Sequence, residues 1–279
     1  MKKFHLHLVS DSTGETVSSV ARASLAQFDG VDAQEHVWSL VRTQGQLEKM
    51  IASLDTYPGI VMFTLVDNAM REHLRQACGK RGLPCIPVLG HVIREMSGYL
   101  DQEATGHTGA QYELGEDYFA RIDAINYALE HDDGQATWEL ENADIVIVGP
   151  SRTSKSPTCV YLAYRGFKAA NVPFVHGIDL PENITHLKQP LMVGLTISGE
   201  RLIEIRTTRL AAMNQDMRTD YVDEEKVSDE IDAAKKLFRS QGWPVIDVTR
   251  RSVEETATLM IQYRQRQLEK RRGTNGNGN

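Results

Sequence analysis

The stretch that decides the fold is DIVIVGPSRTSKSPTCVYLAYRGFKAA, at residues 144–170. Residues 144–149 form a mostly apolar run of the kind found in strands that are buried on both faces of a parallel sheet. A polar segment follows, and from Lys155 onward the pattern predicts a long helix that continues to about residue 170. Strand, short loop and helix in direct succession are the unit from which parallel sheets covered by helices are built.

The loop of this unit, GPSRTSKS, is similar to the G-x-x-x-x-G-K-[ST] pattern that binds phosphate groups. In that pattern, backbone N–H groups and a helix N-terminus hold the phosphates, the lysine reaches the terminal phosphates, and the hydroxyl binds Mg²⁺. Lys155 and Ser156 keep the last two positions, and Arg152 adds a planar donor suited to phosphate. Ser154 replaces the second glycine, so a plain strand-turn-helix stays open as the alternative. The predicted nucleotide-binding residues are Gly149, Pro150, Ser151, Arg152, Thr153, Ser154, Lys155 and Ser156.

Strand and helix signals alternate along most of the chain, which predicts an α/β protein. Predicted strands cover residues 4–10, 36–41, 60–66, 85–90, 144–149, 172–178, 191–197 and 244–248. Other predicted helices cover residues 13–28, 44–54, 68–81, 117–130, 199–214, 223–240 and 252–272. The pattern dissolves among glycines between residues 98 and 115, where we place a domain boundary or a mobile loop. We therefore expect an N-terminal parallel-sheet domain (1–110), a C-terminal phosphate-loop kinase-like domain (111–272) and a disordered tail (273–279).

Composition excludes several classes of protein. The 279 residues include 31 Lys and Arg against 38 Asp and Glu, a net charge of −7, which argues against a general binder of nucleic acids or anionic membranes. No apolar run approaches the roughly 20 residues that a membrane-spanning helix needs. The three cysteines fit no zinc-binding spacing, and the N-terminus has a strand pattern rather than that of a signal peptide. We expect a cytoplasmic protein.

Three weaker signals each have two interpretations. SDSTGET, at residues 10–16, could bind an anion at a helix N-terminus, or Ser12 or Thr13 could simply cap that helix. HDDG, at residues 131–134, could supply carboxylates for phosphoryl transfer, or it could be a solvated turn. Arg206 and Arg209 lie three apart on one predicted helix and could clamp a phosphoryl group or form surface ion pairs.

Five segments in the same order resemble one family, the pyruvate, phosphate dikinase regulatory proteins, whose sister group is the phosphoenolpyruvate synthase regulatory proteins. They are SDSTGET (10–16), YFARIDAINYALEHDDG (118–134), GPSRTSKSPTCVYLAYRGFKAANVPFV (149–175), VGLTISGERLIEIRTTRL (193–210) and PVIDVTRRSVEETA (244–257). The resemblance covers nearly the whole chain apart from the Asn/Gly-rich tail. The synthase regulators tend to keep a glycine at the position of Ser154, so the RTSKS form is more similar to the dikinase branch.

The resemblance implies a bifunctional regulator, a serine/threonine kinase and phosphorylase. Such proteins use ADP to phosphorylate, and so inactivate, a threonine of the dikinase, and they remove that phosphate with inorganic phosphate, releasing pyrophosphate. It implies that residues 149–156 bind the nucleotide, with Ser156 on Mg²⁺, and that Lys155, Arg152, Asp132 and Asp133 are the catalytic candidates. The dikinase is the implied protein partner, a homodimer stays open, and neither nucleic acid nor membrane is expected as a partner.

Alternatives remain at this point. The same chemistry could act on phosphoenolpyruvate synthase, or the chain could be a small-molecule kinase of the phosphate-loop class. Against the latter, no stretch can be assigned as a lid over a small substrate. A non-catalytic nucleotide-sensing inhibitor, which would block its partner stoichiometrically, is the third alternative.

Overall fold

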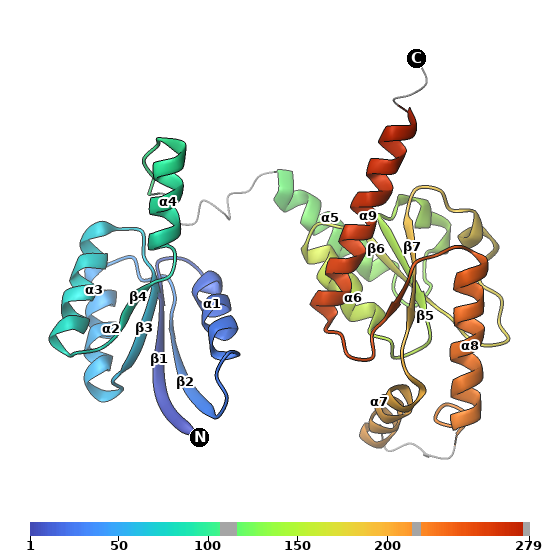
Figure 1. Cartoon of the computed structure of the whole chain (residues 1–279), viewed down its shortest axis with the longest axis horizontal. Helices are drawn as coiled ribbons and strands as arrows, with labels where there is room; N and C mark the ends of the chain where they lie inside the picture. Colours follow the sequence, from blue (N-terminus) through green and yellow to red (C-terminus); the bar gives the residue numbers. More distant parts are fainter. Residues whose placement is uncertain (107–115, 214–218, 276–279) are drawn as a thin grey trace. The chain divides into compact units, whose positions relative to one another are not determined.

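The structure is a computed structural model that describes residues 1–106, 116–213 and 219–275. The chain divides into two units, Met1–Glu113 and Leu114–Asn279, each built around its own four-stranded parallel sheet (Figure 1). The α/β class expected from the sequence is confirmed. The boundary expected between residues 110 and 111 falls outside the described residues.

The first unit has strands β1 (Lys2–Ser10), β2 (Val31–Trp38), β3 (Gly59–Thr64) and β4 (Cys85–Pro87), in the spatial order β2-β1-β3-β4. Its helices are α1 (Glu15–Leu25), α2 (Gln44–Thr56), α3 (Asn68–Lys80) and α4 (Gly90–Leu100). Side chains alternate between the faces of a strand, so Val9 packs in the core under α2 and α3, and Leu8 packs in the core under α1. The sheet is therefore covered on both faces (Figure 1).

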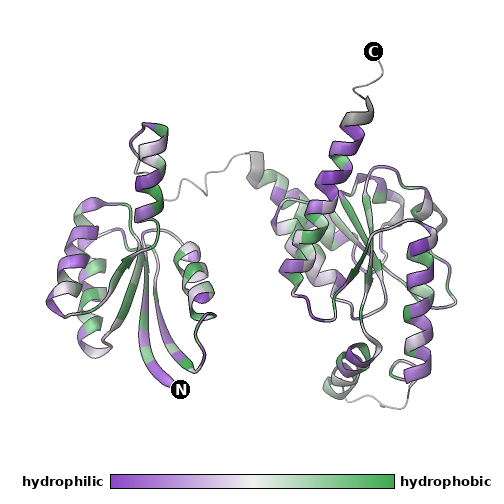
Figure 2. Ribbon diagram, viewed as in Figure 1, coloured by the Kyte–Doolittle hydropathy of each residue, from purple (hydrophilic) through white to green (hydrophobic). Residues whose placement is uncertain are grey.

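The second unit has strands β5 (Ile145–Gly149), β6 (Ala169–Pro173), β7 (Leu191–Thr196) and β8 (Val245–Asp247), in the order β6-β5-β7-β8. Its helices are α5 (Glu116–Glu130), α6 (Lys155–Tyr164), α7 (Gly199–Ala212), α8 (Glu224–Ser240) and α9 (Val253–Asn275), with 3₁₀ turns η2 (Thr137–Asn142) and η3 (Glu182–His186). One core joins the sheet to α5, α6 and α9, and another joins the opposite face to α8. The strands are the most hydrophobic part of this unit (Figure 2).

Several sequence-based boundaries were wrong. The helix expected to continue to about residue 170 ends at Tyr164, because Gly166 adopts the left-handed conformation (φ 85°) that terminates helices. The next strand, β6, consequently begins at Ala169 and ends at Pro173 rather than covering 172–178. Residues 90–100 form α4, where the sequence placed the end of a strand at residue 90, a loop from residue 98 and no element between them. Helix α9 continues to Asn275, into the segment expected to be a disordered tail.

None of the helices within the described ranges is long and apolar enough to span a membrane.

Candidate functional site

The loop after β5 is held at the carboxyl edge of the second sheet by a strand that is buried along its whole length. Gly149, the last residue of β5, lies against the neighbouring strand β7. A Cβ atom at this position would be 2.9 Å from the carbonyl oxygen of Leu195 and 3.1 Å from Oγ1 of Thr153. Only glycine fits here without displacing the backbone, and this close packing explains the first glycine of the motif.

Inside the loop, two side chains converge on one carbonyl oxygen. Thr153 Oγ1 and Lys155 Nζ both donate hydrogen bonds to the oxygen of Pro150, each at 2.9 Å. Thr153 is fully buried and Lys155 is 5% exposed, whereas Arg152 is exposed. The lysine therefore lies within the curve of the loop backbone, whereas the arginine is exposed to solvent.

The loop backbone contains two non-glycine residues in the left-handed region, Arg152 at φ 74° and Ser154 at φ 60°. Ser154 is the N-cap of α6 and forms no side-chain cap hydrogen bond. The first amides of α6 therefore have no capping side chain, which is the arrangement that suits an anion at a helix N-terminus. The left-handed φ also explains why the standard motif has glycine where this chain has Ser154.

Burial changes the acidity of the loop lysine. Desolvation lowers the pKa of Lys155 to about 8, and Asp133, Asp132 and Glu230 oppose that shift by raising it. A lysine with a pKa near neutrality is unusual away from functional sites. It can gain its full charge when an anion enters the loop.

The HDDG segment lies along the free edge of β6. The amide of Gly134 donates to the carbonyl oxygen of Asn171 at 2.8 Å, and the amide of Asn171 donates to that of His131 at 3.0 Å. Asp133 and Gly134 are both left-handed, at φ 49° and 76°, so the segment is a turn, as one interpretation expected. It is a turn fixed to the sheet, and its carboxylates therefore have defined positions.

Asn171 brings these carboxylates to the loop. Its Nδ2 lies 2.6 Å from Asp132 Oδ1, 3.3 Å from Asp133 Oδ1 and 3.0 Å from Ser156 Oγ. Its Oδ1 is buried and has no hydrogen-bond partner among the described residues. Sequence reasoning missed Asn171, although an amide inside the otherwise apolar strand AANVP is a signal that could have found it.

Of the two α7 arginines singled out by the sequence, Arg206 differs from expectation. Arg206 is 2% exposed and forms a two-pronged ion pair with Glu230 of α8, with N–O distances of 2.8 and 3.1 Å. It also donates to the carbonyl oxygens of Ser151 at 3.2 Å and Tyr221 at 3.1 Å. Arg206 is thus a buried link between the phosphate loop and α8 rather than a surface ion pair or a free clamp, while Arg209 is exposed.

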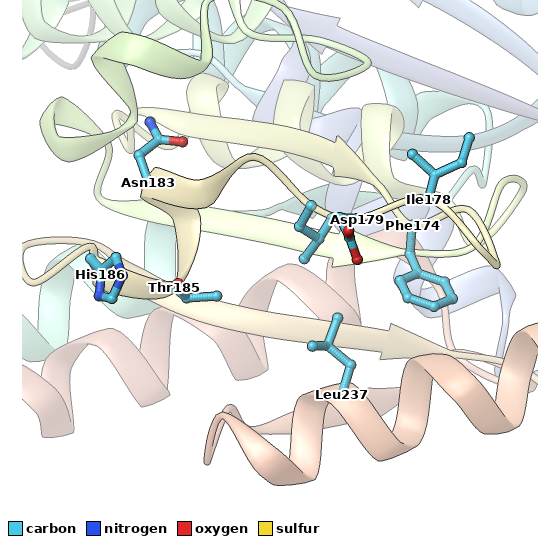
Figure 3. Close-up of a pocket in the computed structure, with 8 residues that line it drawn as sticks. Phe174, Ile178, Asp179, Asn183, Thr185, His186 and Leu237 are labelled. Carbon is cyan, nitrogen blue, oxygen red and sulfur yellow. The ribbon is translucent and has the colours of Figure 1, made fainter.

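A hollow of about 790 Å³ lies in the second unit beneath the connection from β6 to β7 (Figure 3). Phe174 and Leu237 line it on the side of α8, and Asn183, Thr185 and His186 come from η3. Asp179 is its one charged lining residue among those described, so it lacks the cations that a phosphate group needs. The loop after β5 is therefore the better phosphate site of this unit.

The SDSTGET segment follows β1 in the first unit. The prediction that Ser12 or Thr13 caps α1 was wrong, because the N-cap is Gly14, at φ 85° and without a side-chain cap hydrogen bond. Ser10 Oγ instead accepts from Thr64 Oγ1 at 3.0 Å, and Asp11 Oδ2 accepts from the amide of Val66 at 2.7 Å. The polar side chains of this loop thus tie β1 to β3.

Comparison with known proteins gives a consistent result. The kinase/pyrophosphorylase family matches residues 6–261. A protein from Paramagnetospirillum magneticum is 54% identical over 97% of this chain and 87% of its own length. Proteins from Maricaulis maris (49% identical, 92% of each chain) and Ehrlichia chaffeensis (49% identical, 93% of this chain and 95% of its own) are similar over the same region. All three bear the name "Putative pyruvate, phosphate dikinase regulatory protein".

Proposed function

Since this chain belongs to the kinase/pyrophosphorylase family, we propose that it phosphorylates a threonine of a pyruvate, phosphate dikinase with ADP and removes the phosphate by phosphorolysis. The observation that carries the proposal is the contact set of Asn171. Through this one amide, two carboxylates and the loop hydroxyl of Ser156 lie together beside Lys155. Phosphate-binding cations next to a carboxylate able to orient a hydroxyl are what a phosphoryl transfer to an alcohol requires.

Both reactions transfer a phosphoryl group between a threonine oxygen and a phosphate oxygen, in opposite directions. In the kinase direction, the bond between the β-phosphorus of ADP and its bridging oxygen breaks. The phosphoryl group then joins the threonine oxygen, AMP leaves and the hydroxyl proton is released. In phosphorolysis, the bond between phosphorus and the threonine oxygen breaks, the group joins an oxygen of inorganic phosphate to give pyrophosphate, and the threonine oxygen regains a proton.

Each residue has a proposed role in these transfers. Residues 149–156 bind the phosphates through backbone amides and the start of α6. Lys155 and Arg152 stabilise the charge of the phosphoryl group in transit. Asp132 or Asp133 accepts the proton of the threonine hydroxyl, and Asn171 positions both carboxylates.

Mg²⁺ fits the oxygen atoms that surround Asn171. The ion prefers hard oxygen ligands and is usually bound by one or two carboxylates together with water and substrate phosphates. Asp132, Asp133 and Ser156 supply such oxygens, and among the described residues no larger set of His, Cys, Asp and Glu offers a competing metal site. When bound, the ion neutralises charge on the phosphates and aligns the reacting oxygens.

One site serves both directions in this proposal. Inorganic phosphate takes the position that the α-phosphate of ADP occupies in the kinase direction. ADP should therefore inhibit phosphorolysis competitively with respect to inorganic phosphate. A noncompetitive pattern would indicate a second phosphate site instead.

Mass spectrometry tests the proposal directly. Purified dikinase and purified phosphoenolpyruvate synthase are each incubated with this protein, Mg²⁺ and ADP. We expect one phosphothreonine on the dikinase, absent without ADP and reversed by inorganic phosphate with release of pyrophosphate. Phosphate on the synthase alone would move the target. ADP turnover with a small acceptor alone would favour a small-molecule kinase, and inhibition without ADP or phosphate transfer would favour a binding inhibitor.

A further inference from the structure

A second hollow, of about 480 Å³, lies in the first unit at the carboxyl ends of β3 and β4. It is enclosed by the residues that follow β3, by α3 and by the start of α4. Its volume is in the range of small-molecule sites, about 300–1,000 Å³. Ligands of open parallel sheets bind at this edge, outside the carboxyl ends of the strands.

The charges around this hollow are of one sign. Arg71 of α3 and Arg94 of α4 line it, and no Asp or Glu is among the described residues that do. This is notable in a chain whose acidic residues outnumber its basic ones by 38 to 31.

Each guanidinium group has a hydrogen-bond partner that is not a carboxylate. Arg71 Nη1 donates to Asn68 Oδ1 at 3.2 Å, and Arg94 Nη2 lies 3.1 Å from His91 Nδ1. Within the described part of the chain, neither arginine forms an ion pair with a carboxylate. Two arginines that form no ion pair with a carboxylate are suited to bind an anion through their paired N–H groups.

The remaining wall is largely apolar, with Phe63, Val66, Leu89 and Ile93 among the lining residues. Such a wall excludes water and adds favourable contact for a carbon skeleton. Inorganic phosphate has no carbon skeleton, so it would leave the apolar wall without a contact. A ligand with a charged head and an apolar or planar body would use both parts of the hollow.

We propose that this hollow is a binding site for a small organic anion, a phosphate ester or a carboxylate, separate from the phosphate loop. Arg71 and Arg94 would hold the charged head, and the apolar wall would contact the body. The site does not depend on the function proposed for the second unit. It gives the first unit a role as a sensor domain for a metabolite-sized anion.

Calorimetry tests the site in a full-length Lys155→Ala background, which removes the main cation of the phosphate loop. The probes are AMP, phosphoenolpyruvate and inorganic phosphate. We expect AMP or phosphoenolpyruvate to bind, with inorganic phosphate at least about tenfold weaker because it lacks a body. Absence of binding by both organic probes would overturn the proposal.

Matched variants locate the binding. Arg71→Gln combined with Arg94→Gln should weaken binding of the organic anion by about a hundredfold or more, since each of the two lost charge-assisted contacts contributes about tenfold or more. Arg75→Gln, on the same helix as Arg71 but outside the hollow, removes one positive charge, as Arg71→Gln alone does, and should change little. Equal loss in the control, or no loss in the double variant, would contradict the site. If the double Gln variant fails to fold, Arg71→Lys combined with Arg94→Lys takes its place in the test. This variant keeps both charges but loses the paired N–H groups of the guanidinium.

Discussion

In the first unit the chain leaves β1, passes through Ser10 to Gly14 and enters α1; in the second it leaves β5, passes through Pro150 to Ser154 and enters α6. Both sheets have the same plan, with the first strand between the second and third and the fourth outside the third. Both helices begin after a left-handed N-cap that lacks a side-chain hydrogen bond, Gly14 at φ 85° and Ser154 at φ 60°. The two loops are topologically equivalent.

Their charges are opposite. The loop of the first unit includes Asp11 and is followed by Glu15, without a cation. The loop of the second unit includes Arg152 and leads into Lys155, without a carboxylate of its own. The two loops thus share a backbone plan but differ in charge, and of the two only the second places cations at the helix start. This difference supports the proposal that the second loop binds phosphate.

The largest effect is expected for Lys155→Ala. Its charge should stabilise the phosphoryl group more in the transition state than in the bound nucleotide, and losing one such contact lowers the rate by about 10²–10³. Both phosphorylation and phosphorolysis should fall together, measured by phosphothreonine formation and pyrophosphate release. The substitution also removes a charged group that burial penalises, so the protein should remain folded.

Ser12→Ala, in the equivalent loop of the first unit, is the matched control and should leave both rates within about twofold. A folded Lys155→Ala protein that keeps most of its phosphorylation activity would refute the loop assignment. A loop variant that loses phosphorylation but keeps full phosphorolysis would return the first loop to candidacy as a second phosphate site.

The next effect concerns the carboxylates on the β6 edge. Asp132→Asn and Asp133→Asn keep an oxygen that can accept from Asn171 but remove the charge. If one of them is the base, that variant should lower kcat by about a hundredfold with little change in ADP affinity, since general base catalysis contributes about 10²–10⁴. Wild-type turnover in both variants would mean that the HDDG segment is only a turn, without a catalytic role. Binding by calorimetry and turnover by mass spectrometry separate the two quantities.

Much of this arrangement was predictable. Apolar runs such as 144–149 predicted three strands of the second sheet in roughly the right place, and the loop followed from its position after such a run, whereas β6 begins three residues before the predicted strand. A single sequence window does not contain contacts between residues that are far apart in the chain. Asn171 of β6 lies 38 residues from Asp133, and Arg206 of α7 lies 24 residues from Glu230 of α8, so only the folded unit brings each pair together. The helix α4 was missed for a different reason, because none of its residues is buried and its first residue is a glycine.

A smaller effect is expected from pH. The pKa of Lys155 in the free protein is about 8, below the ordinary lysine value of 10.5, because burial penalises the charged form. Bound phosphate favours the protonated lysine, so phosphate affinity should fall about tenfold for each pH unit above 8.

The sign for stability is the opposite. Between pH 8 and 10.5 the unfolded chain holds the extra proton, so the free energy of unfolding should rise with pH across that window through this group. Calorimetric titration with inorganic phosphate at pH 7, 8 and 9 and denaturation over the higher range check both trends. In Lys155→Met, both contributions should vanish. A phosphate affinity that is flat from pH 7 to 9 would place the phosphate elsewhere.

The smallest effect uses the two N-caps as a reciprocal pair. Ser154 is held at φ 60°, where a residue with a Cβ atom is strained by about 1–2 kcal/mol, whereas glycine is not. Ser154→Gly removes that strain but costs about 0.5–1 kcal/mol through the greater freedom of the unfolded chain. The free energy of unfolding should therefore rise by about 0.5–1 kcal/mol.

Gly14→Ala makes the reverse change at φ 85° and also brings the new Cβ to 3.1 Å from Ser39 Oγ, so it should destabilise the protein by about 1 kcal/mol or more. Urea denaturation of both variants measures these differences, and because the two caps lie in different units the effects should add in the double variant. Ser154→Gly should also keep full phosphorylation activity, since the standard motif has glycine there. A destabilised Ser154→Gly protein would mean that the serine side chain contributes more to the loop than its strain removes, and the equivalence of the two caps would then fail.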